Sequence, residues 1–494
     1  MEKSVIVIGS GFSGLASATF LADKGFDVTI LEKNTSAGGR ARVFEEKGFV
    51  FDMGPSWYWM PDVFEKYFNS FGKKPSDYYE LKRLSPSYRV FWGENDFWDI
   101  PSDVNELKSF FESIEKGSGE KLDKFLEQAK IKYDVGINDF VHRPSVSYTE
   151  FIDKNILYGA LKLDLLESFH THIRKFFNNE KILKVMEFPV LFLGATPDKT
   201  PAMYSLMNYA DLVLGTWYPM GGMFKIVEAM VKLAEDKGVK IKYNQNVSKI
   251  NVVDKRANQV ITDKQTFDTN FVVASADYNH VETKLLDEPL RNYNKNYWEN
   301  RVMSPSALLF YLGLDKKVEN LEHHNLFFDT DFPLHAKEIY NSPKWPTEPL
   351  FYLSVASKTD PSVAPEGHEN IVILMPVAVG LEDNEEIREK YYNLIIDRLE
   401  KLTKQEIRKH VIYKKSYAHS NFKEDYNAFK GNAYGLANIL KQTAIFKPSL
   451  KSKKVKNLFF AGQLTVPGPG VPPALISGEL AAKQIEKELI NTRK

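Results

Sequence analysis

The sequence predicts an α/β protein in which a parallel sheet is interrupted by an inserted second domain. Three observations support this: a strand, glycine turn and helix near the N-terminus, a strand, loop and helix near the C-terminus, and alternating strand and helix patterns between them. The apolar fraction of 43% and the charged fraction of 26% are those of an ordinary globular chain.

The first forty residues predict a strand, a turn, a helix and a second strand. The β-branched apolar run 5–8 is typical of a strand buried on both faces, and 28–31 predicts its parallel neighbour. Between them, Gly9, Gly11 and Gly14 have the spacing of a G-x-G-x-x-G turn. The first glycine permits a tight turn, the second lets a pyrophosphate approach the backbone, and the third lets the helix pack on the strand. The segment therefore predicts a Rossmann-like dinucleotide-binding unit.

Four further residues of this unit are expected to contact the dinucleotide. Phe12 and Ser13 stand at the start of the helix, where free N–H groups and the positive end of the dipole attract phosphate. Glu32 and Lys33 follow the second strand. A carboxylate at position 32 accepts hydrogen bonds from ribose hydroxyls and disfavours a phosphorylated ribose.

A second glycine segment distinguishes the kind of dinucleotide. In flavoproteins with a glutathione-reductase-like nucleotide fold, a Gly-Gly-Arg segment at this spacing runs under the dinucleotide. The glycines permit close approach, and the arginine supplies a cation near phosphate or isoalloxazine. FAD is therefore predicted rather than NAD. The residues expected to contact it are Gly38, Gly39, Arg40, Gly54, Pro55 and Ser56.

The C-terminal end predicts a strand over 456–462, a loop rich in proline and glycine, and a helix from near Ala474 to about Leu489. Pro473 suits the first helical turn. Backbone N–H groups at this helix start are expected to face the pyrimidine end of the flavin, where negative charge develops on reduction. The predicted cofactor contacts here are Gly462, Gly470 and Val471.

Together these motifs resemble the bacterial-type phytoene desaturases, which are carotenoid oxidoreductases of the flavin amine-oxidase-like superfamily. The resemblance runs nearly end to end and is carried by residues 7–15, 38–41, 48–55, 194–197, 215–223 and 467–470. One departure is visible: where the family has Gly-Ala-Gly-Thr-His-Pro-Gly, residues 462–468 are Gly-Gln-Leu-Thr-Val-Pro-Gly. The departure lies beside the flavin and bears on which carotenoid is accepted.

The order of the middle elements matches how this family returns to its nucleotide domain, with a helix over 224–238, a strand over 239–250 and a buried strand over 271–277. We therefore expect a discontinuous FAD-binding domain of glutathione-reductase type, made of residues 1–80, 215–285 and 425–494. Residues 81–214 and 286–424 form the inserted substrate-binding domain. The resemblance implies that Val247 contacts adenine through its backbone and that Ala274 lies near the pyrophosphate.

The inserted domain is expected to be rich in helices and aromatic rings. Helices are predicted over 104–116 and 122–133, a long helical stretch over 148–178, and a strand over 371–381. The chain contains 34 Phe, 24 Tyr and 7 Trp residues. An aromatic helix over 57–71 follows the flavin motif directly; it either fills the core or lines an apolar substrate channel, and both interpretations stay open.

The resemblance implies an apolar carotenoid substrate, phytoene or a similar molecule, and therefore a site with few polar groups. Desaturation moves a hydride to the flavin and releases a proton from the neighbouring carbon, while the protein orients the chain and excludes water. Aromatic faces are expected to stabilise positive charge on carbon. Glu150 falls where the family places an acid and is the candidate proton acceptor. The alternative is a charge in the first turn of a surface helix.

Composition excludes several classes of function. Lys and Arg together equal Asp and Glu at 65 each, which argues against a nucleic-acid partner. The absence of cysteine excludes disulfides, thiolate catalysis and thiolate-bound metals. The ten histidines show no ligand spacing, so no metal site is predicted. Four prolines within 458–478 argue against a spanning helix there. We expect a cytoplasmic protein bound peripherally to membranes, because the substrate dissolves only there.

The predicted function is FAD-dependent desaturation of phytoene to lycopene or a related polyene, with a quinone or oxygen as the electron acceptor that the resemblance implies. One alternative is a desaturase or isomerase of a later, hydroxylated or coloured carotenoid. A second alternative, from another class, is a non-catalytic escort protein that binds prenyl lipids on the same fold.

Overall fold

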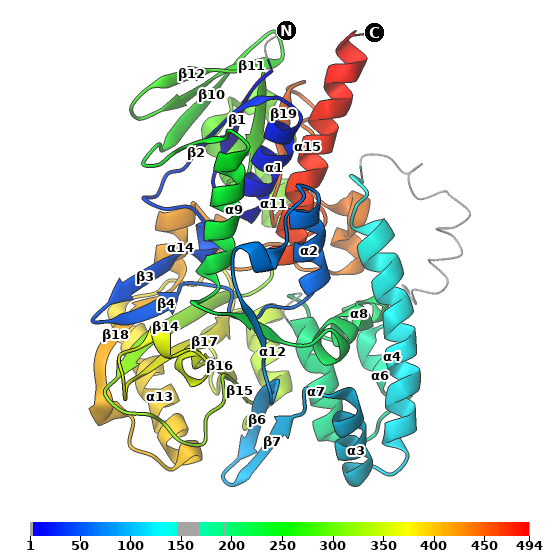
Figure 1. The fold of residues 1–494 in the computed structure, drawn as a ribbon, viewed down its shortest axis with the longest axis vertical. Helices are drawn as coiled ribbons and strands as arrows, with labels where there is room; N and C mark the ends of the chain where they lie inside the picture. Colours follow the sequence, from blue (N-terminus) through cyan, green and yellow to red (C-terminus); the bar gives the residue numbers. More distant parts are fainter. Residues whose placement is uncertain (1–2, 146–166, 192–193, 494) are drawn as a thin grey trace.

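The computed structural model describes residues 3–145, 167–191 and 194–493. A five-stranded sheet and both ends of the chain lie in one part of the molecule, and a seven-stranded sheet and a layer of helices lie in the other (Figure 1). The predicted α/β class with a Rossmann-like sheet is confirmed.

The five-stranded sheet is entirely parallel and has the order β19-β13-β1-β2-β9. The first strand lies at the centre and the last strand at one edge, so both ends of the chain contribute to the same sheet. The strands are β1 Ser4–Ile8, β2 Asp27–Leu31, β9 Lys240–Lys242, β13 Phe271–Ala274 and β19 Leu458–Phe460.

Alternate side chains of the buried strands face two different layers. On one face, Val5, Val7 and Val273 pack against α1 Phe12–Asp23, α9 Phe224–Asp236 and α15 Val471–Arg493. On the other face, Ile6 and Ile8 pack against an antiparallel ribbon of three strands. That ribbon consists of β10 Val247–Val253, β11 Arg256–Thr262 and β12 Thr266–Asp268.

The seven-stranded sheet has the order β18-β14-β17-β16-β15-β6-β7 and is antiparallel except where β15 meets β6. Its long central strands, β14 and β17, pair over nine residues each. The strands are β6 Tyr88–Gly93, β7 Asp96–Ile100, β14 Ser306–Leu314, β15 His324–Phe327, β16 Phe351–Ser354, β17 Glu369–Val377 and β18 Val411–Tyr417.

One face of this sheet packs on α13 Glu385–Thr403. The other face packs partly on a helical layer and partly on the segment that follows the Gly38–Arg40 motif. The helices of the layer are α3 Val104–Ile114, α4 Ser118–Val135, α6 Phe169–Ile173, α7 Glu180–Leu191 and α8 Leu206–Asn208.

The remaining elements connect these layers. Two short antiparallel pairs are β3 Val43–Glu46 with β4 Phe49–Asp52, and β5 Leu81–Arg83 with β8 Trp217–Pro219. The connecting helices are α2 Pro61–Asn69, α10 Tyr278–His280, α11 Lys295–Glu299, α12 Phe332–Tyr340 and α14 His419–Tyr426.

Several predicted boundaries differ from the observed ones. The strand expected over 239–250 is two strands, β9 and β10, because the chain leaves one sheet and enters another between them. The final helix begins at Val471, so Pro472 and Pro473 both lie in its first turn. The aromatic helix begins at Pro61, after the tryptophans. Most of the predicted 148–178 stretch lies outside the described residues, and α6 is its short described part.

The five-stranded sheet takes its strands from 4–31, 240–274 and 458–460, and the seven-stranded sheet from 88–100 and 306–417. The domain boundaries drawn from the sequence stay a prediction.

Candidate flavin site

The glycine turn lies between β1 and α1, with Phe12 and Ser13 as the first residues of the helix. Gly9 has a φ of +98°, which a side chain would strain, and a Cβ on Gly14 would stand 2.0 Å from the Gly9 carbonyl oxygen. A Cβ on Gly11, by contrast, would meet nothing within 4 Å. No side chain caps the N-terminus of α1. The turn thus presents open space and free N–H groups, as a pyrophosphate requires.

Glu32 follows β2 and is buried beside this turn. Its Oε2 accepts hydrogen bonds from the backbone N–H and the hydroxyl of Ser10, at 2.9 and 2.7 Å, and its Oε1 accepts one from Asn34 N at 2.8 Å. Lys33 reaches the carbonyl of Glu424 with its Nζ. The carboxylate is therefore fixed at the carboxyl end of β2, where an acid can meet a ribose.

The segment with Gly38, Gly39 and Arg40 lies against the turn. Gly38 N donates to the Ser10 carbonyl at 2.9 Å, and a Cβ on Gly39 would stand 3.3 Å from Gly11 Cα. A Cβ on Gly54 would stand 2.2 Å from the Arg40 carbonyl oxygen, so Gly54 packs on the backbone of this segment. Ser56, two residues on, lies with its hydroxyl 2.9 Å from that of Tyr352. The two glycine motifs are thus brought together.

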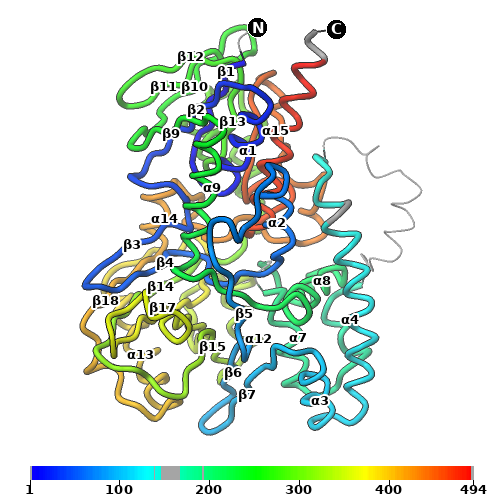
Figure 2. The backbone as a smooth tube through the Cα atoms, viewed as in Figure 1, coloured from blue at the N-terminus to red at the C-terminus, as the bar shows by residue number. Residues whose placement is uncertain are grey.

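The C-terminal loop reaches the same place. A Cβ on Gly462 would stand 3.2 Å from Ser13 Oγ, and Gly462 N donates to Ser477 Oγ at 2.9 Å. Helices α1 and α15 pack side by side, so the blue and red ends of the chain run together (Figure 2). The loop from 462 to 470, which includes Gly470, ends where Val471 begins α15.

The three remaining residues predicted for the site lie in different places. Ala274 ends β13, where its carbonyl accepts a hydrogen bond from Ala461 N at 3.0 Å, so it lies beside the C-terminal loop. Val247 begins β10 and is buried among the side chains on the opposite face of the parallel sheet. Glu150 lies outside the described residues.

Arg40 is held by groups that sequence reasoning missed. Its Nη2 donates to the carbonyl of Asn432 at 3.3 Å, and its guanidinium lies 5.2 Å from the ring centroid of Tyr426. Burial lowers the pKa of Arg40, and the charge of Asp277 opposes this. Burial raises the pKa of Asp277, although the backbone N–H groups of Phe429 and His280 donate to its carboxylate.

The Nε of Arg40 is buried and has no hydrogen-bond partner among the described residues. A buried, unpaired guanidinium donor is costly, and an anionic ligand such as a diphosphate would satisfy it. With the open space at Gly11, this orphaned donor shows that the site fits an anionic dinucleotide.

Of the residues around Arg40, Asp277 could have been suspected from the sequence and Asn432 could not. Asp277 comes just after the buried strand β13, which is a position where an acid can be suspected. Asn432, which also accepts a hydrogen bond from Gln463 Nε2 at 2.8 Å, stands in a loop without any motif. Only the fold places it between Arg40 and the C-terminal loop.

Aromatic rings gather directly after Ser56. The ring centroid of Trp57 lies 4.0 Å from that of His324, 5.5 Å from that of Tyr88 and 5.3 Å from that of Phe188. These rings belong to or border a large apolar cluster that joins β6, β15 and β16 to the helical layer and to Val466 of the C-terminal loop. An apolar region therefore adjoins the flavin motifs.

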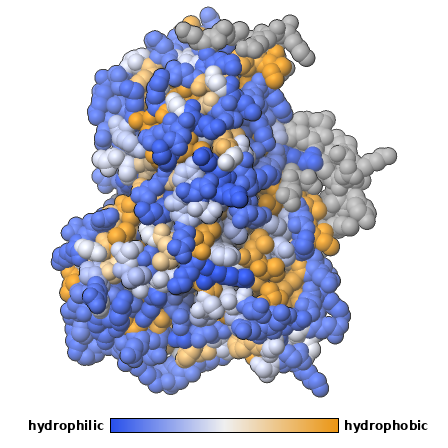
Figure 3. All heavy atoms as spheres, in the orientation of Figure 1, coloured by the Kyte–Doolittle hydropathy of each residue, from blue (hydrophilic) through white to orange (hydrophobic). Residues whose placement is uncertain are grey.

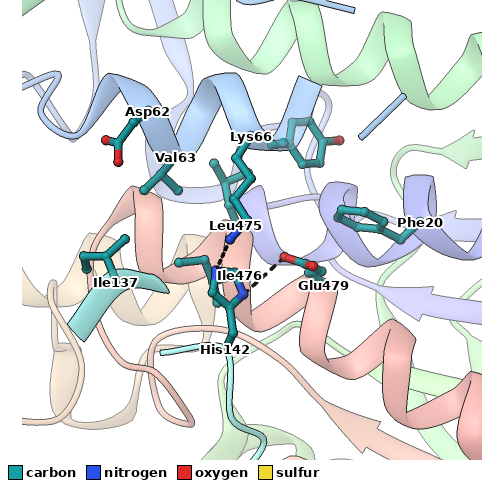
Figure 4. A pocket seen from close by; sticks show the side chains of 10 residues that line it. Phe20, Asp62, Val63, Lys66, Ile137, His142, Leu475, Ile476 and Glu479 are labelled. Carbon is teal, nitrogen blue, oxygen red and sulfur yellow. Dashed lines mark hydrogen bonds and ion pairs between the residues drawn. The ribbon is translucent and has the colours of Figure 1, made fainter. Parts of the chain in front are cut away.

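Two small pockets border this region. One lies where Asp52, Gly54 and Ser56 face β16 and β17. The other lies between α2 and α15, where Val63, Ile137 and Ile476 provide apolar walls (Figure 4). At its edge, Lys66 Nζ lies 2.9 Å from His142 Nε2, and Glu479 lies 3.6 Å from His142 Nδ1.

Comparison with known proteins agrees with this arrangement. Residues 12–486 match the family described as flavin containing amine oxidoreductase. The chain belongs to this family. It is 40% identical over 491 residues to the carotenoid 3,4-desaturase of Haloarcula japonica, covering 99% of both chains. It is 33% identical to the 4,4'-diapophytoene desaturase (4,4'-diaponeurosporene-forming) of Staphylococcus haemolyticus, covering 98% of this chain and 99% of the other.

Within the flavin oxidoreductases, the chain therefore belongs to the carotenoid desaturases, which confirms the resemblance found in the sequence. Solved structures share the fold at low identity. Wild-type putrescine oxidase bound to putrescine superposes with a TM-score of 0.63 at 13% identity, covering 99% of this chain and 99% of the other. Cyclohexylamine oxidase from Brevibacterium oxydans gives 0.59 at 14%, covering 99% and 100%.

In the part of the chain that the structure describes, no helix combines the length and the apolar character needed to cross a membrane. The face shown in Figure 3 is mostly hydrophilic, with apolar groups between the hydrophilic areas.

Proposed function

We propose that this protein is an FAD-dependent desaturase of a linear carotenoid, and that it introduces double bonds into phytoene to give lycopene or a related polyene. The observation that carries the proposal is the meeting of three distant segments at the glycine turn, where Gly39 lies against Gly11 and Gly462 lies against Ser13. The turn is open and rich in N–H donors, and an apolar cluster adjoins it. The desaturase relatives, similar over their whole length, support the same reaction class.

The chain's residues have distinct parts in holding FAD. The N-terminus of α1 and Arg40 bind the diphosphate, Glu32 binds the ribose, and the backbone at Val247 contacts adenine. Ala274 lies near the pyrophosphate, and the loop from Gly462 to Val471 borders the isoalloxazine. When bound, the flavin supplies the acceptor for a hydride.

The apolar cluster orients the polyene and keeps water away. Trp57, Tyr88 and Phe188 present ring faces near the flavin motif, and such faces attract positive charge that develops on a carbon losing hydride. This part of the proposal fails if Trp57→Leu, with full flavin content, turns over substrate at the wild-type rate.

Glu150 is proposed as the acceptor of the proton that leaves the neighbouring carbon. Glu150→Gln keeps the size of the side chain and removes its basicity. We expect turnover to fall at least tenfold while the flavin stays bound. Unchanged turnover with bound flavin would exclude Glu150 as the proton acceptor.

The electron acceptor and location follow from the substrate's chemistry. A carotenoid dissolves only in membranes, so we propose that the protein binds the membrane surface from the cytoplasm and passes electrons to a quinone or to oxygen. Reoxidation of the reduced protein by quinone in vesicles, compared with oxygen in buffer, distinguishes the acceptors.

A second candidate substrate is a later, partly desaturated or hydroxylated carotenoid. The 40% identical relative carries the name of a 3,4-desaturase, which favours this candidate. Expression with a phytoene supply, and separately with a lycopene supply, followed by pigment analysis, decides between them. Unchanged phytoene together with a longer chromophore from lycopene would select the second candidate. A folded protein that purifies colourless would instead indicate an escort protein.

A further inference from the structure

A buried lysine lies beneath the C-terminal loop. Lys447 follows the short helical turn Ala444–Phe446, and only 4% of its surface is exposed. Its Nζ donates to Asn438 Oδ1 at 2.9 Å. No carboxylate pairs with it among the described residues. Its amine therefore has one neutral partner in the structure.

Such a position is unfavourable for an ammonium group. Removing a cation from water costs free energy unless an opposite charge or several hydrogen bonds replace the solvent. Burial accordingly lowers the pKa of Lys447 to about 7. A negative charge arriving nearby would restore the cation and be stabilised by it.

The amine touches the loop that ends at α15. A Cβ on Gly468 would stand 3.0 Å from Lys447 Nζ and 3.1 Å from Asn438 Oδ1. Pro448, which follows Lys447, also contacts this loop, because Thr465 Oγ1 donates to the Pro448 carbonyl at 2.6 Å. Lys447 thus lies against Gly468, in the last part of the loop before Val471 begins α15.

Residues 432–447, the segment that ends in Lys447, also border the site at Asn432. Asn432 accepts hydrogen bonds from Arg40 and from Gln463, so residues 432–447 extend from the arginine segment to the closing loop. The arginines of that segment have acids nearby: Asp277 faces Arg40, and Asp425 pairs with Arg42 at 2.5 Å. Lys447, at the opposite end of the stretch, has none.

We propose that Lys447 is the cation that offsets the negative charge which the flavin gains on reduction. The inference rests on the proposed function, because it requires a flavin in the site. A hydride carries two electrons and one proton from a substrate carbon to the flavin, whose charge falls by one, and the neighbouring carbon releases its proton to a base or to water. Lys447 forms no covalent bond in this step; its charge favours the reduced cofactor.

The test is the midpoint potential of the bound flavin, which needs no carotenoid. Lys447→Met and Lys447→Gln remove the charge, and removing an unpaired buried cation is compatible with folding. We expect the reduced state to be disfavoured at least tenfold, which lowers the potential by about 30 mV for a two-electron couple. Asn438→Asp is a third variant, because a carboxylate at this position pairs with the ammonium and should lower the potential in the same sense.

The matched control is Lys451→Met. Lys451 lies on the same segment but pairs with Glu488 at 2.6 Å and is one-third exposed, so its removal should leave the potential unchanged. Variants with full flavin content and the wild-type potential overturn the inference, as does an equal shift in the control. If the neutral variants lose the flavin, Asn438→Asp is the test: a lowered potential supports the inference, and the wild-type potential overturns it. A wild-type protein that binds no flavin contradicts the proposed function instead.

Discussion

At the scale of single residues, the glycines of the first turn are needed for different reasons. Gly14 is required by the fold, because a Cβ there would stand 2.0 Å from the Gly9 carbonyl oxygen. Gly11 faces open space and has a φ of −69°, which alanine adopts freely. The structure thus separates a glycine that packs the turn from one that leaves room for a ligand.

Gly11→Ala should therefore fold like the wild type but bind flavin at least tenfold more weakly, which is about 1.4 kcal/mol. The added methyl group occupies the space through which the diphosphate approaches. Flavin titration of the apoprotein and thermal unfolding measure the two effects. Gly93→Ala, also in open space but at the end of β6, is the control and should change neither. Equal flavin affinity in all three proteins would contradict the assignment of the turn.

A buried acid gives a second prediction at this scale. Asp211 is 1% exposed and accepts hydrogen bonds from the Tyr88 hydroxyl at 3.1 Å and the Thr216 hydroxyl at 3.2 Å. Burial raises the pKa of Asp211 from 3.8 to about 7. The folded state therefore holds the proton more tightly than the unfolded chain, and this contribution to stability is lost as the pH rises from about 4 to about 7.

Asp211→Asn should remove that pH dependence. The free energy of unfolding of the wild type, minus that of the variant, should decrease between pH about 4.5 and pH about 8, by roughly 3 kcal/mol. Asp52, whose pKa burial raises to about 6, is present in both proteins, so the difference isolates Asp211. Denaturant unfolding at several pH values measures it. A difference that stays constant with pH would show that the carboxyl titrates normally.

At the scale of elements, the packing of α1 on α15 joins the two ends of the chain. The contact is close because Gly478 has no side chain: a Cβ there would stand 2.4 Å from the Ser13 carbonyl oxygen and 2.8 Å from Ala16 Cβ. The same contact fixes the turn at the start of α1 against the loop before α15. Helix packing and cofactor geometry are therefore coupled.

Gly478→Ala should lower the free energy of unfolding by about 1–3 kcal/mol, as overpacking commonly does. It should also weaken flavin binding, because the helices must separate at Ser13. Lys483→Ala is the control on the exposed face of α15, where its pair with Glu479 contributes about 0.5 kcal/mol or less. Thermal unfolding of both variants, with and without flavin, measures these effects. Equal losses of stability in Gly478→Ala and Lys483→Ala would contradict the close contact between α1 and α15.

At the scale of the whole molecule, residues 49–57 join the two sheets. The segment leaves the flavin motif and lies on one face of the seven-stranded sheet. Tyr311 donates its hydroxyl proton to the Met53 carbonyl at 2.8 Å, Asn370 Nδ2 donates to the Val50 carbonyl at 2.9 Å, and the hydroxyls of Ser56 and Tyr352 lie 2.9 Å apart. These hydrogen bonds fix the segment that leads from the flavin motif to Trp57 against the seven-stranded sheet.

Tyr311→Phe should lower the free energy of unfolding by about 1–3 kcal/mol, because it leaves the Met53 carbonyl without its partner. Tyr413→Phe is a matched control, since both rings pack on Phe44 and Phe51. No hydrogen bond of the Tyr413 hydroxyl is found among the described residues, so this change should be nearly neutral. Denaturant unfolding of both variants measures the two effects. Equal losses of stability in Tyr311→Phe and Tyr413→Phe would show that the hydrogen bond to Met53 does not stabilise the fold.

The sequence already contained the local parts of the site. Strand 5–8 and the turn at Gly9 to Gly14 are contiguous, and Glu32 directly follows the next strand, so their geometry follows from short-range sterics and burial patterns. The proline- and glycine-rich loop was also visible, although the helix after it starts at Val471 rather than near Ala474. Prolines are tolerated in a first helical turn because they lack only an N–H that the turn does not use.

The sequence by itself determined the class of fold, the dinucleotide turn and the family of the protein, because each of these is read from short motifs whose own residues are close together in the chain. Only the tertiary structure decided that Asn432 lies between Arg40 and Gln463, that Lys447 lies under Gly468, and that Tyr311 fixes Met53. These contacts join residues from separate elements, and no local pattern encodes which loop a folded sheet will bring beside another.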